Sequence, residues 1–466
     1  MADDALIYAP AHRLAALIAT RKLSPVTLVD AVIARAEQVD PHLNCFATRL
    51  FDQARDAARR AEDDVLHGRP LGPLHGVPIT VKDGVATAGH PMTCGSYAMA
   101  DIVATSDAVV WQRLRAAGAI LLGKTATPEF FHKVLTDSPI YGVTRNPWAL
   151  DRTPGGSSGG AAACLAAGIG PLAVGTDGGG SIRCPASWAG VLGLKATLGR
   201  VPHDGFADTF GNYSFVGPMA RDVRDMALML SVMSGPDIAD AHSRAVPPFP
   251  VDAVTLPSLR GLRVGWMPQF GGTPADPDIA ALTARAVRLM AEDGAEVSEF
   301  SDSAFDDAFD TYVVIATAAH AARLGPFVAR FGERMTASLK ASIAQGGAYT
   351  AADLMRAIDR RTVLYRHTQR LFDRFDVLAM PTMTVPPPPL DAGGAINTLH
   401  YAAWARTLYP FNLTGNPAAS VPCGFASDGL PVGLQIVGPW HEEGRIIDAA
   451  AFLEGTIRWA DRRPPL

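Results

Sequence analysis

Cysteine is scarce in this sequence and is nowhere clustered. The five cysteines contain no C-x-x-C pair, and no group of histidines lies beside them. A zinc site usually shows closely spaced ligands, and a disulfide framework is typical of short, cysteine-rich secreted chains, so the sequence predicts neither. Scattered free cysteines suit a reducing compartment, and we expect a cytoplasmic protein without a metal ion. The five are Cys45, Cys94, Cys164, Cys184 and Cys423.

An excess of positive charge is also missing. The chain has 41 lysine and arginine residues against 46 aspartate and glutamate residues, which gives a formal net charge of −5. A protein that binds a phosphate backbone by itself usually carries a basic surplus. We therefore expect no nucleic-acid partner for this chain alone and expect a small organic substrate instead.

Signals for export or for a membrane are absent as well. The chain starts Met-Ala-Asp-Asp-Ala-Leu-Ile-Tyr, without the basic start and apolar run of a secretory signal, so we expect no export. One long run without charge, residues 153–176, is rich in glycine, serine and alanine and contains Pro171. A membrane-spanning helix is predominantly apolar. We therefore interpret this run as buried protein and expect no membrane partner.

The organisation of the chain indicates an α/β protein. Helical patterns fill residues 1–70, and residues 262–300 show a strand, a helix and a second strand, which predicts parallel pairing. Residues 236–257 are rich in proline and aspartate and are predicted to form a surface linker or excursion. We expect residues 1–466 to form a single domain, with residues 74–220 at its centre.

One lysine and two serine loops carry the strongest chemical signal. Six lysines occur against 35 arginines, and Lys82 ends the apolar stretch of residues 74–82, which reads as a short strand. Most lysines face solvent, but burial lowers a lysine pKa and supplies the neutral amine that can act as a base. Downstream, Gly155-Gly-Ser-Ser-Gly-Gly160 and Asp177-Gly-Gly-Gly-Ser-Ile-Arg183 leave serine hydroxyls uncrowded and backbone N–H groups free. Taken alone, the first loop looks like a nucleophile loop.

A competing motif lies between these features. Gly118 to Thr125 formally matches G-x-x-x-x-G-K-[ST], the P-loop of nucleotide-binding proteins. In a P-loop the four middle residues cradle phosphate after a strand, whereas here they are Ala-Ile-Leu-Leu and favour the strand itself. We interpret Lys124 as structural and keep nucleotide binding as an alternative that ATP binding by the purified chain would support.

Together the lysine and the two loops resemble the amidase signature family. The motifs G-V-P-x-x-x-K-D, G-G-S-S-G-G and G-x-D-x-G-G-S-I-R occur in this order, and segments 416–424 and 429–438 are similar to the C-terminal part of the family. The resemblance therefore covers most of the chain. It implies a large, mixed, mostly parallel twisted β-sheet with helices on both faces. It also implies hydrolysis of a carboxylic amide to an acid plus ammonia or an amine, without a cofactor.

The resemblance implies a triad of two serines and a lysine. By position, Ser181 is the nucleophile, Ser157 the relaying serine and Lys82 the base. A serine hydroxyl is a poor nucleophile until a neighbour removes its proton, and serine–lysine arrangements achieve this. An acyl-enzyme on Ser181 would follow, and water would release the acid. The family also implies a cis peptide between Gly156 and Ser157.

The second loop offers donors for an oxyanion hole. Losing one such preorganised donor typically costs about 3 kcal/mol of transition-state stabilisation. Cys184 follows closely, but no histidine motif accompanies it, and we expect a buried structural thiol. The candidate donors are the N–H groups of Gly178, Gly179, Gly180 and Ser181. The predicted supporting residues are Ser158, Thr176, Asp177 and Arg183, and ordinary loop capping explains any one of these four equally well.

Substrate choice is the least constrained feature. By resemblance Phe130, Phe131 and Leu135 are predicted to line a pocket for an apolar or aromatic acyl group, and core packing is an equally good explanation of these residues. Esters and carbamates stay open beside amides. The nearest alternative is the amide-cleaving chain of an aminoacyl-tRNA amidotransferase, which needs a partner and tRNA. We expect instead a monomer or homodimer that acts on a small amide.

Overall fold

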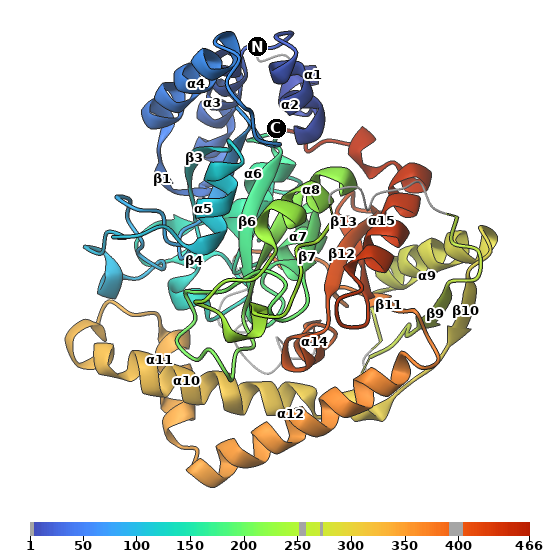
Figure 1. The fold of residues 1–466 in the computed structure, drawn as a ribbon. Helices are drawn as coiled ribbons and strands as arrows, with labels where there is room; N and C mark the ends of the chain where they lie inside the picture. Colours follow the sequence, from blue (N-terminus) through green and yellow to red (C-terminus); the bar gives the residue numbers. More distant parts are fainter. Residues whose placement is uncertain (1–3, 251–257, 271–273, 391–403) are drawn as a thin grey trace.

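A single large β-sheet forms the centre of the molecule (Figure 1). The computed structural model describes residues 4–250, 258–270, 274–390 and 404–466. Within these ranges eleven strands lie in the order β1-β3-β2-β6-β8-β7-β12-β13-β11-β9-β10. They are β1 (Phe46–Arg49), β2 (Pro78–Lys82), β3 (Ile120–Thr125), β6 (Leu172–Asp177), β7 (Leu192–Lys195), β8 (Phe215–Ala220), β9 (Arg263–Trp266), β10 (Glu296–Glu299), β11 (Val377–Pro381), β12 (Ala418–Phe425) and β13 (Pro431–Val437), and a separate small sheet pairs β4 (Asp137–Ser138) with β5 (Gly142–Val143).

The expected mixed sheet is confirmed, and its parallel pairs lie toward the two ends. β2 pairs in parallel with β3 and β6, and β9 pairs in parallel with β10 and β11. From β6 through the centre to β11 the described ladders are antiparallel, and so is β1 with β3. The sheet is therefore not mostly parallel: six of its described ladders are antiparallel and four are parallel. One cause is the short connection between β12 and β13, because a short turn can join only antiparallel neighbours.

Helices cover both faces of this sheet. Along β6, Ala173 packs with α6 and α7, whereas Leu172 and Val174 belong to the cluster that contains α8 and α15. Alternate residues of a strand point to opposite faces, so the two groups of helices lie on opposite sides. The helices are α1 (Asp4–Ile7), α2 (Ala11–Ala19), α3 (Pro25–Leu43), α4 (Phe51–Leu66), α5 (Val109–Ala116), α6 (Gly159–Ala166), α7 (Arg183–Ala189), α8 (Val223–Met233), α9 (Pro277–Glu292), α10 (Ala308–Phe331), α11 (Ala337–Gly347), α12 (Ala351–Leu371), α14 (Tyr409–Thr414) and α15 (Glu443–Ile457).

The helices predicted near the N-terminus are present, and α3 begins for the reason expected. The Ser24 hydroxyl accepts hydrogen bonds from the backbone N–H groups of Val26 and Thr27, and Pro25 occupies the first turn. A serine cap satisfies N–H groups that the helix cannot pair, and proline at the first position loses no hydrogen bond. This end of the chain forms the upper part of Figure 1.

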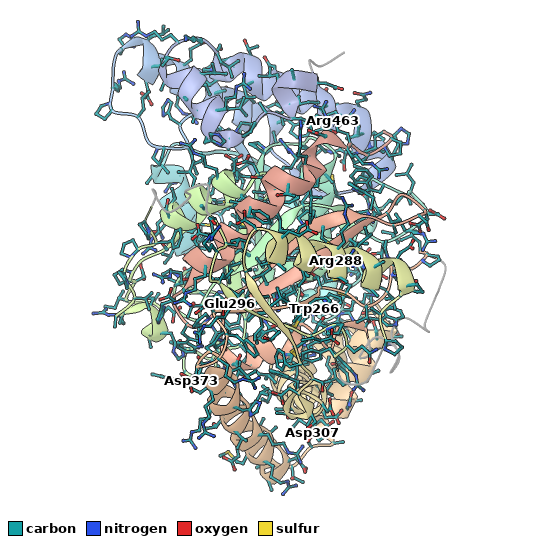
Figure 2. The ribbon with its side chains drawn as sticks, turned by 90° about the vertical axis from the view of Figure 1, so that its right-hand side faces the viewer. Trp266, Arg288, Glu296, Asp307, Asp373 and Arg463 are labelled. Carbon is teal, nitrogen blue, oxygen red and sulfur yellow. The ribbon has the colours of Figure 1, made fainter. Side chains whose placement is uncertain are left out.

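The strand-helix-strand unit predicted over residues 262–300 is also confirmed. β9, α9 and β10 follow one another, and β9 pairs in parallel with β10. Figure 2 shows this edge of the sheet, with Trp266 on β9, Glu296 on β10 and Arg288 on the covering helix α9 labelled. The excursion predicted over 236–257 is described as far as residue 250 and contains a 3-10 turn at Ala241–Ser243, whereas residues 251–257 lie outside the described residues.

A helical arm made of α10, α11 and α12 forms the lower edge of Figure 1. Among the described residues, one helical stretch is long and apolar enough to cross a membrane by length and composition, and it is Ser303–Phe331, which contains α10. The charge-free run around the first serine loop does not form such a helix, because it divides into a loop, the short α6 and the strand β6. The arm packs against α14 and so reaches toward the second serine loop.

Candidate active site

Lys82 ends β2 and its side chain is fully buried. Its Nζ lies 2.6 Å from Ser157 Oγ, 2.7 Å from Thr176 Oγ1 and 3.1 Å from Ser158 Oγ. Burial lowers the pKa of Lys82 to about 7, although the negative charge of Asp177 opposes that shift. A large share of the Lys82 amine is therefore neutral near pH 7, and the neutral form is the one that can act as a base.

The fold explains why the lysine meets these hydroxyls. β2 and β6 are parallel neighbours, so Lys82 and Thr176 lie at the same edge of the sheet. The first serine loop reaches this edge because α6 packs closely on backbone: a Cβ on Gly160 would lie 2.6 Å from both the Ala126 nitrogen and the Cys45 carbonyl oxygen. Glycine at this position therefore brings the start of α6 to the lysine.

The hydrogen bonds around Ser158 restrict which way the lysine can face. The Ser158 hydroxyl donates to the Thr176 carbonyl oxygen at 3.1 Å and also accepts from the Thr176 N–H at 3.2 Å. Its proton is thus in use, so toward Lys82 it acts as an acceptor. A neutral amine has two N–H groups and one lone pair. If Ser158 and Thr176 accept the two N–H groups, the lone pair faces the Ser157 hydroxyl and can take its proton.

Two backbone contacts join the serine loops. The Ser158 N–H donates to the Ser181 carbonyl oxygen at 3.1 Å, and the Thr127 hydroxyl donates to the Ser157 carbonyl oxygen at 2.9 Å. The peptide between Gly156 and Ser157 is cis, as the resemblance implies. The residues predicted as nucleophile and relay therefore belong to directly contacting loops.

Ser181 lies on the open side of its loop. Between residues 176 and 183, only Thr176, Gly178 and Ser181 are half-buried, and the others are buried. The Ser181 hydroxyl hydrogen-bonds to no residue in the described ranges of the chain. A hydroxyl that is accessible and unpaired can be approached by a substrate.

A buried ion pair shapes the second loop and changes one expectation. The Arg183 guanidinium donates to both Asp177 oxygens at 2.9 and 3.0 Å, and both side chains are fully buried. Burial by itself would raise the pKa of Asp177, but the charge and hydrogen bonds of Arg183 hold that pKa well below its usual range. Asp177 also accepts from the Gly180 N–H at 2.7 Å. The expectation that Gly180 is a free oxyanion donor is therefore wrong for this structure.

Two residues that sequence reasoning missed complete this network. The Asn412 amide donates to the Asp177 carbonyl and carboxylate oxygens at 2.8 and 2.9 Å. The Gln435 side-chain oxygen accepts from Arg183 at 2.7 Å. Both residues are fully buried polar side chains, and Gln435 interrupts the apolar strand β13. A lone polar residue in an apolar strand is a usable signal, because buried polar groups need partners.

The three predicted pocket residues separate in the structure. The Phe131 ring centroid lies 5.0 Å from Lys82 Nζ, so this residue is at the site. Phe130 instead stacks on Phe327 of α10 at 5.8 Å between ring centroids. Leu135 is buried behind the first serine loop, where its backbone nitrogen would lie 3.0 Å from a Cβ on Gly156. Phe131 is therefore the one of the three that contacts the lysine.

An anchor holds the segment that carries Phe131. Phe130 and Phe131 have φ values of +46° and +61°, a region that costs about 1 kcal/mol or more per non-glycine residue. The buried Glu129 carboxylate accepts from the Ser96 hydroxyl at 2.8 Å and from the Thr336 hydroxyl at 2.7 Å. This contact ties the segment to the start of α11, and it is a positioning role that the sequence did not indicate.

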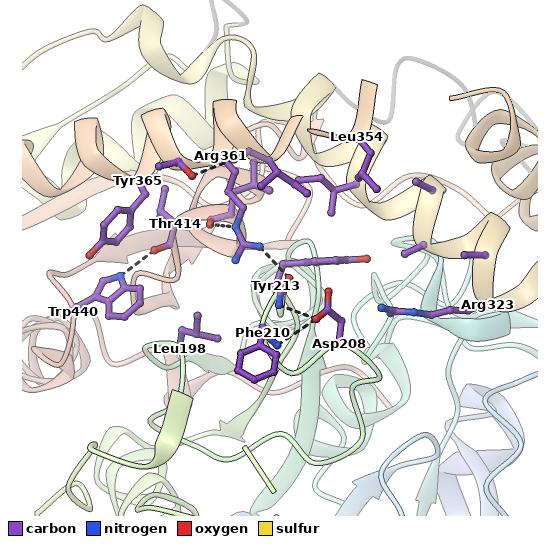
Figure 3. A pocket seen from close by; sticks show the side chains of 18 residues that line it. Leu198, Asp208, Phe210, Tyr213, Arg323, Leu354, Arg361, Tyr365, Thr414 and Trp440 are labelled. Carbon is purple, nitrogen blue, oxygen red and sulfur yellow. Dashed lines mark hydrogen bonds between the residues drawn. The ribbon is translucent and has the colours of Figure 1, made fainter. Parts of the chain in front are cut away.

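A cavity of about 570 Å³ lies outside the triad (Figure 3). Its walls include residues of α10 and α12, Trp440 and Tyr213, and no triad residue lines it. Tyr213 links it to the site, because its carbonyl oxygen accepts from Asn412 at 3.3 Å. The cavity and the triad are therefore neighbouring but distinct features.

Burial and secondary structure decide two alternative interpretations of the sequence, a reactive thiol at Cys184 and a P-loop at residues 118–125. Cys184 is fully buried, and burial raises the pKa of its thiol, as expected for a structural cysteine. Ile120–Thr125 form β3, so the middle of the P-loop motif is a strand and not a phosphate-cradling loop. Lys124 is fully buried and donates to the carbonyl oxygens of Asp83 and Val85 at 3.1 and 2.7 Å. Its structural role is confirmed.

One group of potential metal ligands occurs within the described ranges, formed by His12, Asp222 and Asp225. The Asp225 carboxylate accepts from the His12 ring at 2.7 Å and from the Ala11 and His12 N–H groups at 2.5 and 2.8 Å. These bonds satisfy the carboxylate and join the start of α2 to α8. We assign the group to packing.

Known proteins resemble this chain over nearly its whole length. The amidase family model matches residues 27–447. An acylamidase from Rhodococcus erythropolis is 38% identical over 473 positions, covering 100% of this chain and 98% of the relative. One chain of the glutamyl-tRNA(Gln) amidotransferase from Moorella thermoacetica is 35% identical, and the match covers 99% of both chains.

Solved structures give the same result. A bacterial aryl acylamidase of the amidase signature family has a TM-score of 0.89 at 32% identity and covers 97% of this chain and 98% of the other. 6-Aminohexanoate cyclic dimer hydrolase has a TM-score of 0.88 at 32% identity, with 98% and 99% coverage. The chain therefore belongs to the amidase signature family, whose enzymes hydrolyse carbon–nitrogen bonds.

Proposed function

We propose that this protein is an amidase that hydrolyses a linear carboxylic amide to an acid plus ammonia or an amine, through an acyl-enzyme on Ser181. The observation that carries the proposal is the fully buried Lys82, with a pKa lowered to about 7, at 2.6 Å from Ser157 Oγ. A base with a pKa near the working pH is the most effective acceptor for a serine proton. We further propose that the chain acts in the cytoplasm as a monomer or homodimer, without nucleic acid or membrane.

The first chemical step is acylation. Neutral Lys82 takes the proton of Ser157, and Ser157 takes the proton of Ser181 as the Ser181 oxygen attacks the amide carbon. The carbonyl π electrons move to oxygen and give a tetrahedral oxyanion. Return of the proton along the same relay to the amide nitrogen breaks the carbon–nitrogen bond and releases the amine. Water then attacks the ester of Ser181 by the same proton route and releases the acid.

The oxyanion needs donors that are already in place. In the second serine loop the N–H groups of Gly178, Gly179 and Ser181 donate to no acceptor in the described part of the chain. Asp177 holds the loop through Gly180, and Arg183 holds Asp177. The proposed oxyanion hole therefore consists of these three free N–H groups on a loop that a buried ion pair keeps in one conformation.

The substrate class follows from the wall beside the lysine and from the relatives. Phe131 is an aromatic surface next to Lys82, which favours an apolar or aromatic acyl group. Similarity to an acylamidase and to an aryl acylamidase supports an acyl amide of this kind. Esters and carbamates are secondary candidates because the same acyl transfer cleaves them where the pocket admits them.

The decisive measurement is hydrolysis by the purified chain alone. A panel of aliphatic amides, anilides, esters and carbamates is expected to give turnover with anilides or other apolar acyl amides, and Ser181→Ala is expected to lose it. A serine-directed fluorophosphonate is expected to label the unaltered protein and not Ser181→Ala. Labelling of another residue would contradict the assignment of the nucleophile.

A second candidate function rests on one observation, the 35% identity to a chain of a glutamyl-tRNA(Gln) amidotransferase over 99% of both chains. A chain of that kind would use the same serine chemistry to release ammonia for a partner. The panel separates the two functions, because the amidase works without a partner. Glutamine as the single hydrolysed substrate, or no turnover at all, would favour the amidotransferase function.

A further inference from the structure

Tyr312 of α10 lies directly against the second serine loop. A Cβ on Gly179 would lie 2.5 Å from the Tyr312 hydroxyl oxygen, which is closer than any real contact, so only glycine fits below it. The ring stacks on Tyr409 at 4.6 Å between centroids and meets the Tyr213 ring edge-on at 6.0 Å. Two aromatic neighbours therefore fix where the hydroxyl points.

The Tyr312 hydroxyl is an unused donor at this place. No hydrogen bond joins it to any residue in the described ranges, and the side chain is half-buried, so that a ligand can reach the hydroxyl. Tyrosine joins an apolar ring to a polar hydroxyl, so a ring held by packing can present its hydroxyl to a bound molecule. Burial raises the pKa of Tyr312 well above its usual value, so the phenol keeps its proton and can donate. The hydroxyl can therefore donate to an oxygen atom of a bound substrate.

The position of this donor points to one substrate atom. The Gly179 N–H is one of the three free N–H groups of the proposed oxyanion hole, and the Tyr312 hydroxyl lies against Gly179. We propose that Tyr312 donates a hydrogen bond to the carbonyl oxygen of the substrate at this loop and strengthens that bond as the oxyanion forms. The inference rests on the proposed amide hydrolysis. It adds one side-chain donor, from helix α10 of the helical arm, to an oxyanion hole that otherwise consists of backbone N–H groups.

The test is Tyr312→Phe, which removes one oxygen and keeps the ring that stacks on Tyr409. Because no hydrogen bond within the described protein is lost, the variant is expected to fold with an unchanged melting temperature. For an anilide substrate we expect kcat to fall by about 10²-fold, the loss typical of one oxyanion donor, with KM changed less than about threefold. A change in KM with kcat retained would overturn the assignment to the oxyanion.

Binding of an inhibitor that forms a tetrahedral adduct is a second measurement, and a change in packing alone would not selectively weaken it. In a trifluoromethyl ketone the Ser181 oxygen adds to the carbonyl carbon, the π electrons form the oxyanion, and the serine proton passes to Lys82 through Ser157. Tyr312→Phe is expected to weaken this inhibitor by the same factor as kcat/KM, and to leave binding of the carboxylic acid product unchanged. Equal loss for inhibitor and product would overturn the proposal.

Tyr213→Phe is the matched control. Its ring contacts Tyr312, but Tyr213 lines the cavity shown in Figure 3. We expect less than about a twofold change in kcat for this variant. Unaltered kinetics in Tyr312→Phe, with Ser181→Ala inactive, would refute the role of Tyr312 and leave the amidase function standing. Absence of any hydrolysis by the unaltered protein would remove the amidase function and this inference with it.

Discussion

Two buried lysines on neighbouring parallel strands invite comparison. Lys82 ends β2, and Lys124 lies near the end of β3, paired with Val81. Both side chains are fully buried, and burial lowers their pKa values to about 7 and about 8. Alternate residues of a strand face opposite sides of the sheet, so the two amines point to opposite faces. Burial has thus produced nearly the same titration behaviour at two places.

Their partners differ, and the difference decides the chemistry. Lys124 donates to two backbone carbonyl oxygens, which have no proton to give. Lys82 lies among three hydroxyls, and the protons of the Ser157 and Thr176 hydroxyls go to no other described acceptor. A lowered lysine pKa therefore indicates a base only where the amine faces a proton donor.

The largest expected effect separates the two lysines directly. Lys82→Met keeps the volume of the side chain and removes the base, so kcat/KM for an amide should fall by about 10⁴-fold or more, as when a member of a serine triad is lost. The measurement is steady-state hydrolysis, with circular dichroism to show that the variant is folded. Activity within tenfold of the unaltered protein would remove Lys82 as the base.

The pH dependence sharpens the same point. Because the neutral amine of Lys82 is the active form, kcat/KM should rise about tenfold per pH unit below the pKa of about 7 and level off above it. At pH 5 the rate should be about 10²-fold below the plateau. A rate profile that is flat between pH 5 and 7 would contradict this assignment.

A smaller effect is expected from the hydroxyl that orients the amine. Ser158→Ala removes the acceptor at 3.1 Å from Lys82 Nζ and should lower kcat/KM by about tenfold, the value of one hydrogen bond to an ionisable group. Ser157→Ala, which interrupts the relay itself, is the comparison and should lose far more activity. Equal losses in the two variants would mean that Ser158 also transfers a proton.

The smallest effect on activity should come from the second lysine. Lys124→Met should leave kcat/KM within about threefold and lower the free energy of unfolding by about 1–3 kcal/mol, because two buried carbonyl oxygens lose their donor. Urea denaturation measures the stability and the anilide assay the activity. An inactive but stable Lys124→Met would break the comparison with Lys82.

The sequence predicted the parts of the site that are local in the chain. The serines lie in glycine loops whose conformations short motifs specify, and the strand ending at Lys82 follows from its apolar run. The same holds for α3, where Ser24 and Pro25 mark the first turn. Local motifs of this kind can be predicted without knowing which distant residues they contact.

The parts that the sequence did not predict depend on distant contacts. The hydrogen bond from the Gly180 N–H depends on where the Asp177 carboxylate lies. The partners Asn412 and Gln435 come from the last fifth of the chain. The antiparallel centre of the sheet is a similar case, because strand order is decided by packing among segments far apart in sequence. Phe130 and Phe131 face different ways because both have left-handed φ values, which no pattern in the sequence indicated.

The buried arginine of the second serine loop has a consequence for synthesis of the protein. Arg183 bonds Asn412, which is 229 residues further along the chain, and Gln435, which is 252 residues further. A chain emerging from the ribosome therefore carries both serines and the lysine long before the loop has its partners. An unfinished chain holds the reactive groups without the arrangement that makes them reactive, and hydrolysis should begin only when nearly the whole protein has been made.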